Sequence, residues 1–268
     1  MNQPPYLAPP KALLRGVGRA SADYRVSQDG DRILLGVSGG KDSLSLLLVL
    51  RHLQRYAPVS FQLGVITVDP EIDGFDPSVL TRYYDGLGVT WHYRRQPIME
   101  EAKSRLTGDS FCAYCARMKR GIMYAACREH GYNGLALAQH LDDLAESFLM
   151  SAFHQGQLGT MKAHYVIDAG DIRVIRPLVY VRETQTAAFA AAASLPVVPD
   201  SCPACFSAPT QREHTKHLLA REENANPQLF AKLLSAMRPL MGERNSGSRS
   251  SIEFRHKRQT GKQTGDSE

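Results

Sequence analysis

The stretch Ile33-Leu34-Leu35-Gly36-Val37-Ser38-Gly39-Gly40-Lys41-Asp42-Ser43 decides the fold of this chain. Its first five residues form an apolar run typical of a buried parallel strand, and the apolar segment Leu44 to Leu53 predicts a helix. The two glycines between them let the backbone approach an anion closely, and the first N–H groups of a helix have no partners inside it. The stretch therefore predicts an anion site at a strand–turn–helix junction. An ordinary strand–helix turn with incidental glycines is the weaker interpretation.

Side chains in the same stretch narrow the kind of anion site. Ser38 and Ser43 add hydroxyl donors, and Lys41 adds a positive charge. Asp42 is unusual beside a phosphate unless it faces a magnesium ion. The spacing matches neither the Walker A loop, G-x-x-x-x-G-K-[ST], nor the dinucleotide-binding loop, G-x-G-x-x-G.

Composition sets the broad class. The chain has 268 residues, of which 43% are hydrophobic, enough for one large α/β domain or two small ones. It shows no apolar run of membrane-spanning length and no signal-peptide pattern, so we expect a soluble intracellular protein without a membrane partner. The net charge of +5 suits a polyanionic partner such as nucleic acid, although basic tails give the same value.

Apolar runs alternate with helical patterns along most of the chain. This alternation predicts an α/β fold with a doubly wound, mostly parallel five-stranded sheet, an N-terminal helix and C-terminal helices. The expected strands are 33–37, 61–68, 89–94, 134–138 and 172–175. The expected parts are an N-terminal arm and helix (1–26), the main domain (27–240) and a polar, disordered tail (241–268).

Carboxylates follow two of the expected strands. Asp69 ends the second strand, and Asp142 and Asp143 follow the fourth, after His140. Side chains at the carboxyl ends of parallel strands lie on the ligand side of the sheet. Either Asp142 or Asp143 could cap the next helix, which leaves the other as a candidate magnesium ligand or general base. His140 could cap, pack or contact the substrate.

Four of the five cysteines form two C-x-x-C pairs, Cys112 with Cys115 and Cys202 with Cys205. In an intracellular chain such pairs indicate metal or redox chemistry, although their separation does not match a compact zinc ribbon. Cys112 and Cys115 would share one face of a helix and could bind one metal site. We expect the remaining Cys127, among alanines, to be a buried core thiol. The adjacent cations, which could hold phosphates or form a solvated face, are Arg117, Lys119 and Arg120.

Taken in order, these motifs resemble the PP-loop ATP pyrophosphatases, and in particular the TtcA-like tRNA 2-thiocytidine synthetases. The resemblance runs from about Lys11 to Met237. Its motifs are Ser38-Gly-Gly-Lys-Asp-Ser43, Asp73-Gly74-Phe75, Cys112-x-x-Cys115, His140-x-Asp142-Asp143, Ile175-Arg176-Pro177-Leu178, Arg182-Glu183 and the late cysteines.

The resemblance implies an ATP-dependent tRNA thiolase. Such enzymes adenylate the 2-oxo group of a tRNA cytidine, at position 32 of the anticodon loop, and replace it with sulfur delivered by a [4Fe–4S] cluster. Further implied are Mg²⁺, tRNA, a cysteine desulfurase or sulfide as sulfur donor, a homodimer and a cytoplasmic location. The implied ATP-binding residues are Val37, Ser38, Gly39, Gly40, Lys41, Asp42, Ser43, Asp69, Ala138 and Asp143. Of these, Lys41, Asp42 and Asp143 are the candidate catalytic residues. The implied cluster ligands are Cys112, Cys115 and Cys205, with Cys202 as the alternative third ligand, and the implied RNA-binding residues are Arg117, Lys119 and Arg120.

The chain departs from the family pattern at two motifs. Gln139 stands where the family has a histidine, and Cys205 is followed by Phe206-Ser207-Ala208 instead of Gly-Ser-Gln. A uridine-thiolating enzyme of the TtuA type is therefore an alternative. A nucleic-acid-binding protein with a structural Cys₄ zinc site is another, and such a site would use all four paired cysteines. The paired cysteines argue against an amide-forming or lysidine-forming PP-loop ligase.

Overall fold

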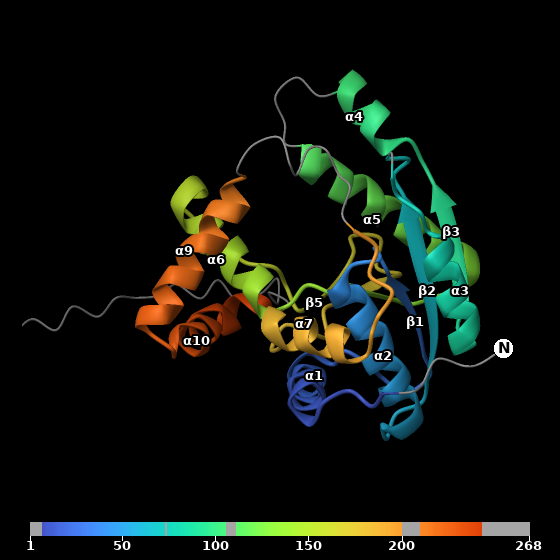
Figure 1. Ribbon diagram of the computed structural model, residues 1–268, viewed down its shortest axis with the longest axis horizontal. Coiled ribbons are helices and arrows are strands. Elements are labelled where there is room, and N and C mark those ends of the chain that lie inside the picture. Colours follow the sequence, from blue (N-terminus) through green and yellow to red (C-terminus); the bar gives the residue numbers. More distant parts are fainter. Residues whose placement is uncertain (1–6, 73, 106–110, 200–209, 243–268) are drawn as a thin grey trace, which may run out of the picture.

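The computed structural model describes residues 7–72, 74–105, 111–199 and 210–242, and a six-stranded sheet lies at its centre (Figure 1). The strand order is β3-β2-β1-β4-β6-β5. Five strands run parallel, and β5 pairs antiparallel with β6. The strands are β1 (Asp31–Gly36), β2 (Phe61–Asp69), β3 (Thr90–Arg95), β4 (Gly134–Ala136), β5 (His164–Val166) and β6 (Arg173–Ile175).

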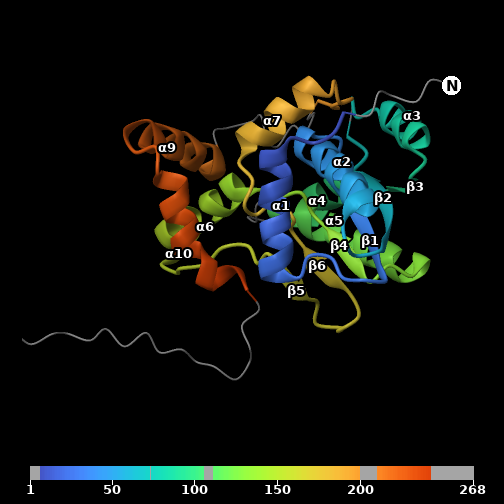
Figure 2. The same ribbon diagram turned by 90° about the horizontal axis from the view of Figure 1, so that it is seen from below.

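Helices connect the strands and cover both faces of the sheet (Figures 1 and 2). They are α1 (Lys11–Tyr24), α2 (Lys41–Tyr56), α3 (Ser78–Leu87), α4 (Ile98–Arg105), α5 (Phe111–His130), α6 (Leu141–Gln155), α7 (Glu183–Ala192), α9 (Gln211–Ala225) and α10 (Leu229–Met241). Among the described residues, no helix is long and apolar enough to cross a membrane. The predicted doubly wound α/β class is confirmed.

The predicted number of strands is wrong by one, because β5 was not expected. This strand is three residues long and lies at the edge of the sheet, with partly exposed side chains, so it lacks the apolar run that marks the buried strands. Helix α4 was also not expected, since only Ile98 and Ala102 of its described side chains are fully buried. Helix α10 ends at Met241, one residue beyond the predicted end of the main domain at 240, and residues 243–268 of the predicted tail lie outside the described part of the chain.

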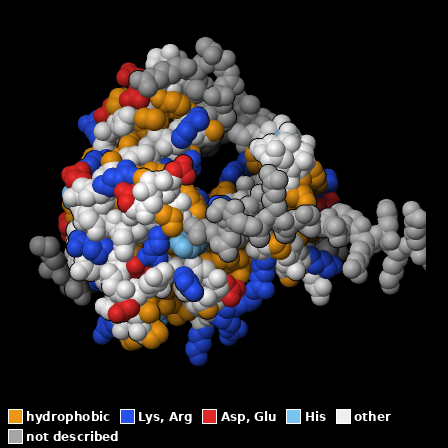
Figure 3. Space-filling model, turned by 180° about the vertical axis from the view of Figure 1, so that it is seen from behind, with side chains coloured by type: hydrophobic (Ala, Val, Ile, Leu, Met, Phe, Trp, Pro, Cys, Tyr) orange, Lys and Arg blue, Asp and Glu red, His pale blue; other side chains and the backbone are white. Residues whose placement is uncertain are grey.

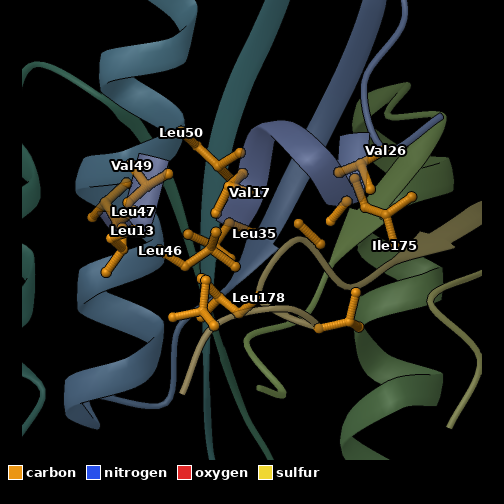
Figure 4. Close-up of a cluster of buried hydrophobic side chains, with 14 of the residues drawn as sticks. Leu13, Val17, Val26, Leu35, Leu46, Leu47, Val49, Leu50, Ile175 and Leu178 are labelled. Carbon is orange, nitrogen blue, oxygen red and sulfur yellow. The ribbon is translucent and has the colours of Figure 1, made fainter. Parts of the chain in front are cut away.

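Strand β1 is buried on both faces, which explains its continuous apolar sequence. Leu35 faces a core cluster shared with α1, α2, α7 and α10, and Leu34 faces a second cluster shared with α5. Figure 4 shows Leu13 and Val17 of α1 beside Leu46 and Leu50 of α2 in the first cluster. Helix α1 is therefore part of the main core, although it precedes the predicted domain boundary at residue 27.

Strand β1 lies between β2 and β4 in the sheet. From β1 the chain continues to β2 and β3 on one side, and then returns to β4 on the other side of β1. The carboxyl ends of β1 and β4 are thus the switch point of the sheet, where open α/β folds bind their ligands. We call this rim, formed by residues 37–43 after β1 and 137–143 after β4, the carboxyl edge. Helix α5 precedes β4 through a short turn and so begins on the same side of the sheet.

Candidate active site at the carboxyl edge

The loop after β1 is fixed by backbone contacts that require glycine. Val37 N–H donates to the Ile66 carbonyl at 2.8 Å, which continues the pairing of β1 with β2. Gly39 has φ +89°, in the left-handed region that glycine adopts readily. A Cβ at Gly39 would also lie 3.0 Å from Val198 Cβ. Both the conformation and the space therefore restrict this position to glycine.

Helix α2 begins at this loop without a capping side chain. Gly40 is its N-cap residue, with extended φ and ψ, and no side chain accepts a hydrogen bond there. The Ser43 hydroxyl donates to the Gly40 carbonyl at 2.9 Å, and Gly40 N–H donates to Ser38 Oγ at 3.4 Å. The first N–H groups of α2 and the positive end of its dipole therefore face the loop, as an anion site requires.

Lys41 projects toward two carboxylates. Its Nζ lies 2.8 Å from Glu183 Oε1 and 3.0 Å from Asp42 Oδ2. Burial alone would lower the pKa of Lys41, but the hydrogen bonds to Glu183 and Asp42 outweigh it and raise the pKa. The ammonium group is therefore charged and held at the mouth of the loop.

Glu183, the first residue of α7, links Lys41 to the C-terminal helices. Its Oε2 lies 2.7 Å from Lys216 Nζ of α9. Burial opposes ionisation of Glu183, yet the hydrogen bonds from Lys216 and Lys41 lower its pKa to about 2. The carboxylate is therefore ionised at neutral pH and neutralises two cations at the site.

Asp42 joins the two loops of the carboxyl edge. The Thr186 hydroxyl of α7 donates to Asp42 Oδ1. His140, at the end of the β4 loop, has its Nε2 3.7 Å from Asp42 Oδ2. Carboxylate oxygens at this position are suitable ligands for Mg²⁺ beside a phosphate.

His140 is the N-cap of α6, which is one of the three roles left open for it, and neither Asp142 nor Asp143 occupies that position. Asp143 N–H donates to His140 Nδ1 at 3.3 Å, and His140 N–H donates to Asp143 Oδ2 at 3.0 Å, a reciprocal capping box. Asp142 accepts from the Arg182 guanidinium at 3.1 Å and from Glu183 N–H at 2.8 Å. The adjacent aspartates thus have different environments, because helix geometry turns them to different neighbours.

A third carboxyl lies one helical turn after Asp143. The Glu146 side chain is buried, and burial together with the charge of Asp143 raises its pKa to about 7. Arg212 of α9 has its Nη1 3.3 Å from Asp143 Oδ1 and 3.6 Å from Glu146 Oε2. Helix α9 therefore covers the acidic side of α6 with a cation.

The remaining predicted ATP contacts also lie along this edge. Asp69 at the end of β2 is 6% exposed, and it accepts hydrogen bonds from Glu71 N–H at 2.8 Å and from the Tyr93 hydroxyl. Ala138 immediately precedes Gln139 and His140 in the loop after β4. The structure thus brings the predicted residues from β1, β2 and β4 to one rim.

Helix α5 separates its two described cysteines by environment. Cys127 is fully buried, and burial raises its thiol pKa to about 12, so the predicted core thiol is confirmed. Cys115 is half-buried near the start of the helix and packs against the second core cluster. Cys112 belongs to the same helix, but its side chain lies outside the described residues, as do Cys202 and Cys205.

The three predicted RNA-binding residues divide between two surfaces. Arg117 and Arg120 line a depression between α5 and β5, which Tyr124 and Tyr165 also line. We call it the α5–β5 depression. Lys119 is half-buried and does not line it. The spacing of residues 117, 120 and 124 places them on one helix face, and residue 119 on another.

The space-filling view shows an opening between the sheet and the C-terminal helices (Figure 3). Some Lys and Arg side chains are visible beside it. Carboxylates and cations at the carboxyl edge can bind an ATP–magnesium complex, and nearby cations can attract a larger polyanion.

Sequence reasoning missed residues that complete the site from α6, α7 and α9. Glu183 was noted only as part of a motif, and Arg212 and Lys216 were not assigned to the site. Arg212 and Lys216 are four residues apart, so they share a helix face, which is the one pattern that could have indicated a common target. Glu146 lies within an apolar helix, and a single buried carboxylate has no pattern of its own.

Comparison with known proteins shows the general class to which this protein belongs. A family model described as a PP-loop domain matches residues 17–217. The fold is similar to that of the U34-tRNA thiolase NcsA from Methanococcus maripaludis, solved with its [4Fe–4S] cluster. The TM-score is 0.72, with 21% identity, over 87% of this chain and 79% of that chain. The chain is therefore a PP-loop protein.

Curated relatives give the particular family. The chain is 41% identical to the tRNA-cytidine(32) 2-sulfurtransferases of Geobacter metallireducens and of Geobacter sulfurreducens, in each case over 85% of this chain and 89% of the relative. The corresponding protein of Syntrophotalea carbinolica is 38% identical over 82% of this chain and 85% of the relative. The chain belongs to the tRNA-cytidine(32) 2-sulfurtransferase family.

Proposed function

We propose that this protein thiolates cytidine 32 of tRNA, using ATP to activate the 2-oxo group and releasing AMP and pyrophosphate. The observation that carries the proposal is the carboxyl edge, where the uncapped N-terminus of α2 and Lys41 lie beside Asp42, and His140 lies between Asp42 and Asp143. The relatives named tRNA-cytidine(32) 2-sulfurtransferase support cytidine 32 as the target base.

The chain's own residues account for the activation step. A carbonyl oxygen is a poor leaving group, and transfer of AMP to it makes it a good one. The N–H groups of α2 and Lys41 bind phosphate oxygens and stabilise the charge that develops on pyrophosphate. Asp42 and Asp143 are the proposed magnesium ligands, and the bound nucleotide replaces part of the contact of Lys41 with Glu183.

The donor set on α5 fits an iron–sulfur cluster. Cys115 lies near the start of the helix, on the side of the sheet where the carboxyl edge lies, and Cys112 is in the same turn. Thiolates are the ligands that such clusters use. We propose Cys112, Cys115 and Cys205, or Cys202 in place of Cys205, as the three ligands. When bound, a [4Fe–4S] cluster with one iron lacking a protein ligand supplies sulfur to the activated carbon.

The proposed partners follow from the same chemistry. The tRNA is the substrate, and sulfide or a cysteine desulfurase supplies the sulfur. We further propose a homodimer in the cytoplasm, and Arg117, Lys119 and Arg120 as contacts to the RNA backbone. Arg117 and Arg120 have no ion-pair partner among the described residues, which supports the last point.

Metal analysis tests the cluster part of this proposal. We expect the anaerobically purified protein to contain about four irons and four sulfides per chain and to absorb broadly in the visible. Alanine at one of Cys202 and Cys205 should remove the iron, and alanine at the other should retain it. One zinc per chain without iron after anaerobic reconstitution, or equal loss of metal from both variants, would contradict the cluster and favour a structural Cys₄ site.

A further inference from the structure

The α5–β5 depression has the lining of a nucleotide site and lies apart from the ATP loop. Arg117, Arg120 and Tyr124 line it from successive turns of α5. Tyr165 of β5 and Asp168 of the following turn line the opposite side. Two guanidinium groups, two phenol rings and one carboxylate thus face the same space of about 360 Å³.

Tyr165 is held in place before any ligand binds. The buried Arg176 guanidinium lies 5.7 Å from the centre of its ring, and Lys162 Nζ lies 5.9 Å away. The Tyr165 hydroxyl is 3.3 Å from that of Tyr124, and burial raises the pKa of Tyr124, so the Tyr124 phenol is neutral. A fixed, partly exposed aromatic ring is a platform on which a base can stack with little loss of side-chain entropy.

The arginines on this side of α5 keep their charge available for an anion. Among the described residues, no carboxylate lies within ion-pair distance of Arg117 or Arg120. Arg128, on the last turn of the same helix, is by contrast bound to Asp171 at 2.6 Å. Planar guanidinium groups bind phosphate oxygens in pairs, so the depression suits a phosphodiester.

Two structural links connect the depression to the proposed reaction site, one along α5 and one through Arg176. Arg120 follows Cys115 by five residues, which is about 7.5 Å along the helix axis. Arg176, under Tyr165, donates from Nε to Gln139 Oε1 at 2.8 Å, and Gln139 precedes the cap residue His140. A strand of RNA whose target base is near Cys115 can therefore place a neighbouring nucleotide in the depression.

We propose that the α5–β5 depression binds one unpaired nucleotide adjacent to the base that is modified. Arg117 and Arg120 bind its phosphate, the base stacks on Tyr165, and Asp168 accepts a hydrogen bond from the ribose 2′-hydroxyl. This proposal rests on the proposed function, because it takes the substrate to be RNA. Extrusion of loop nucleotides onto aromatic side chains is a common mode of RNA recognition.

Binding of a labelled anticodon stem-loop RNA to the full-length protein tests the subsite. Tyr165→Leu should weaken binding roughly 10-fold with an unchanged salt dependence, and Tyr165→Phe should bind like the wild type. Arg120→Ala should weaken binding and lower the slope of log K against log salt by about 1. The matched control Arg128→Ala, on the same helix, should leave both quantities unchanged. The wild type should bind a DNA stem-loop of the same sequence more weakly than the RNA stem-loop. Asp168→Ala should bind the DNA and the RNA stem-loops equally.

Two different failures can be separated in this experiment. If the wild type binds and thiolates the stem-loop, but folded Tyr165→Leu and Arg120→Ala bind it equally tightly, the subsite is wrong and the proposed function stands. If the wild type binds neither stem-loop RNA nor whole tRNA, the proposed function itself is contradicted. Arg120→Ala provides a readout that does not depend on whether the leucine variant folds, because Arg120 is only half-buried and lines the depression.

Discussion

The carboxyl edge and the α5–β5 depression differ in how their charges are balanced. At the edge, Lys41 and Lys216 share the carboxylate of Glu183, and Arg212 faces Asp143. In the depression, Arg117 and Arg120 have no carboxylate within ion-pair distance among the described residues. The edge is thus organised by contacts inside the protein, whereas the depression presents two guanidinium groups that have no ion-pair partner in the described part of the chain.

This difference indicates two kinds of binding. The groups of a small ligand and its magnesium ion can replace the internal ion-pair contacts one at a time. Such a ligand also needs the geometry that those ion pairs maintain. A long polyanion is attracted by unbalanced charge, and its affinity depends strongly on salt. We therefore expect substitutions at the edge to affect chemistry most and substitutions on α5 beyond the cysteines to affect RNA affinity most.

The largest effect should come from Cys115, which lies near the start of α5. We expect Cys115→Ala to lose bound iron and all detectable thiolation while it still binds ATP, because a cluster ligand is removed and the α2 loop is not. Iron content, ATP binding and thionucleoside yield measure this directly. Cys127→Ala, in the buried part of the same helix, is the matched control and should keep its iron. Normal iron in Cys115→Ala would remove this residue from the cluster.

The next largest effect should come from Lys41. Lys41→Ala removes a charged donor from the phosphate site, and we expect the rate of AMP release to fall about 100- to 1,000-fold. Melting temperature and RNA binding should change little, because the side chain is partly exposed and its partner Glu183 retains Lys216. Lys232→Ala, on α10, is the control. An unchanged rate of AMP release would exclude Lys41 from the mechanism.

Glu146 gives a pH-dependent effect on stability. Its pKa is raised from 4.5 to about 7, so the folded protein binds this proton more tightly than the unfolded chain. The carboxyl is protonated in both states below pH 4.5, and the cost of ionising it in the folded state grows up to about pH 7. Glu146→Gln cannot ionise and should therefore gain stability relative to the wild type, reaching about 3 kcal/mol at pH 8.

Chemical denaturation of Glu146→Gln and wild type across this pH range measures the difference. The exposed Glu222→Gln is the control and should show no such trend. A stability difference that is constant from pH 4 to pH 8 would mean that Glu146 has the same pKa in the folded protein as in the unfolded chain. Its pairing with Arg212 would then offset its burial.

The smallest effect should come from Lys119, which lies off the face that lines the depression. We expect Lys119→Ala to weaken RNA binding by about 3-fold or less, with a smaller change in salt slope than Arg120→Ala produces. The same binding assay measures both. A larger loss for Lys119→Ala than for Arg120→Ala would place the RNA on the other face of α5.

The sequence was most informative where several physical requirements restrict the same few residues. The strand, glycine turn and helix around Gly39 predicted the loop because backbone conformation, packing space and burial all restrict the same few residues. The sequence left the cap of α6 open among His140, Asp142 and Asp143, because each of these side chains can accept a backbone hydrogen bond. Only the orientation of the helix shows that His140 accepts it.

Contacts between distant elements could not be predicted. Glu183 meets Lys41 across 142 residues, and Arg182 joins Asp142 to Glu223 over the ring of Phe230. Such contacts depend on how α7, α9 and α10 pack against α6, which no local spacing encodes. Tyr165 was missed for a similar reason, since a three-residue edge strand leaves little pattern in the sequence.

Nucleoside analysis tests the central claim most directly. The anaerobically reconstituted protein would be incubated with tRNA, Mg-ATP and sulfide, and the digested tRNA would be examined by mass spectrometry. We predict 2-thiocytidine at position 32, formed only with ATP, with AMP released in equal amount. A protein that holds its cluster and hydrolyses ATP yet yields no thionucleoside would contradict the account, and 2-thiouridine in place of 2-thiocytidine would contradict the assigned base.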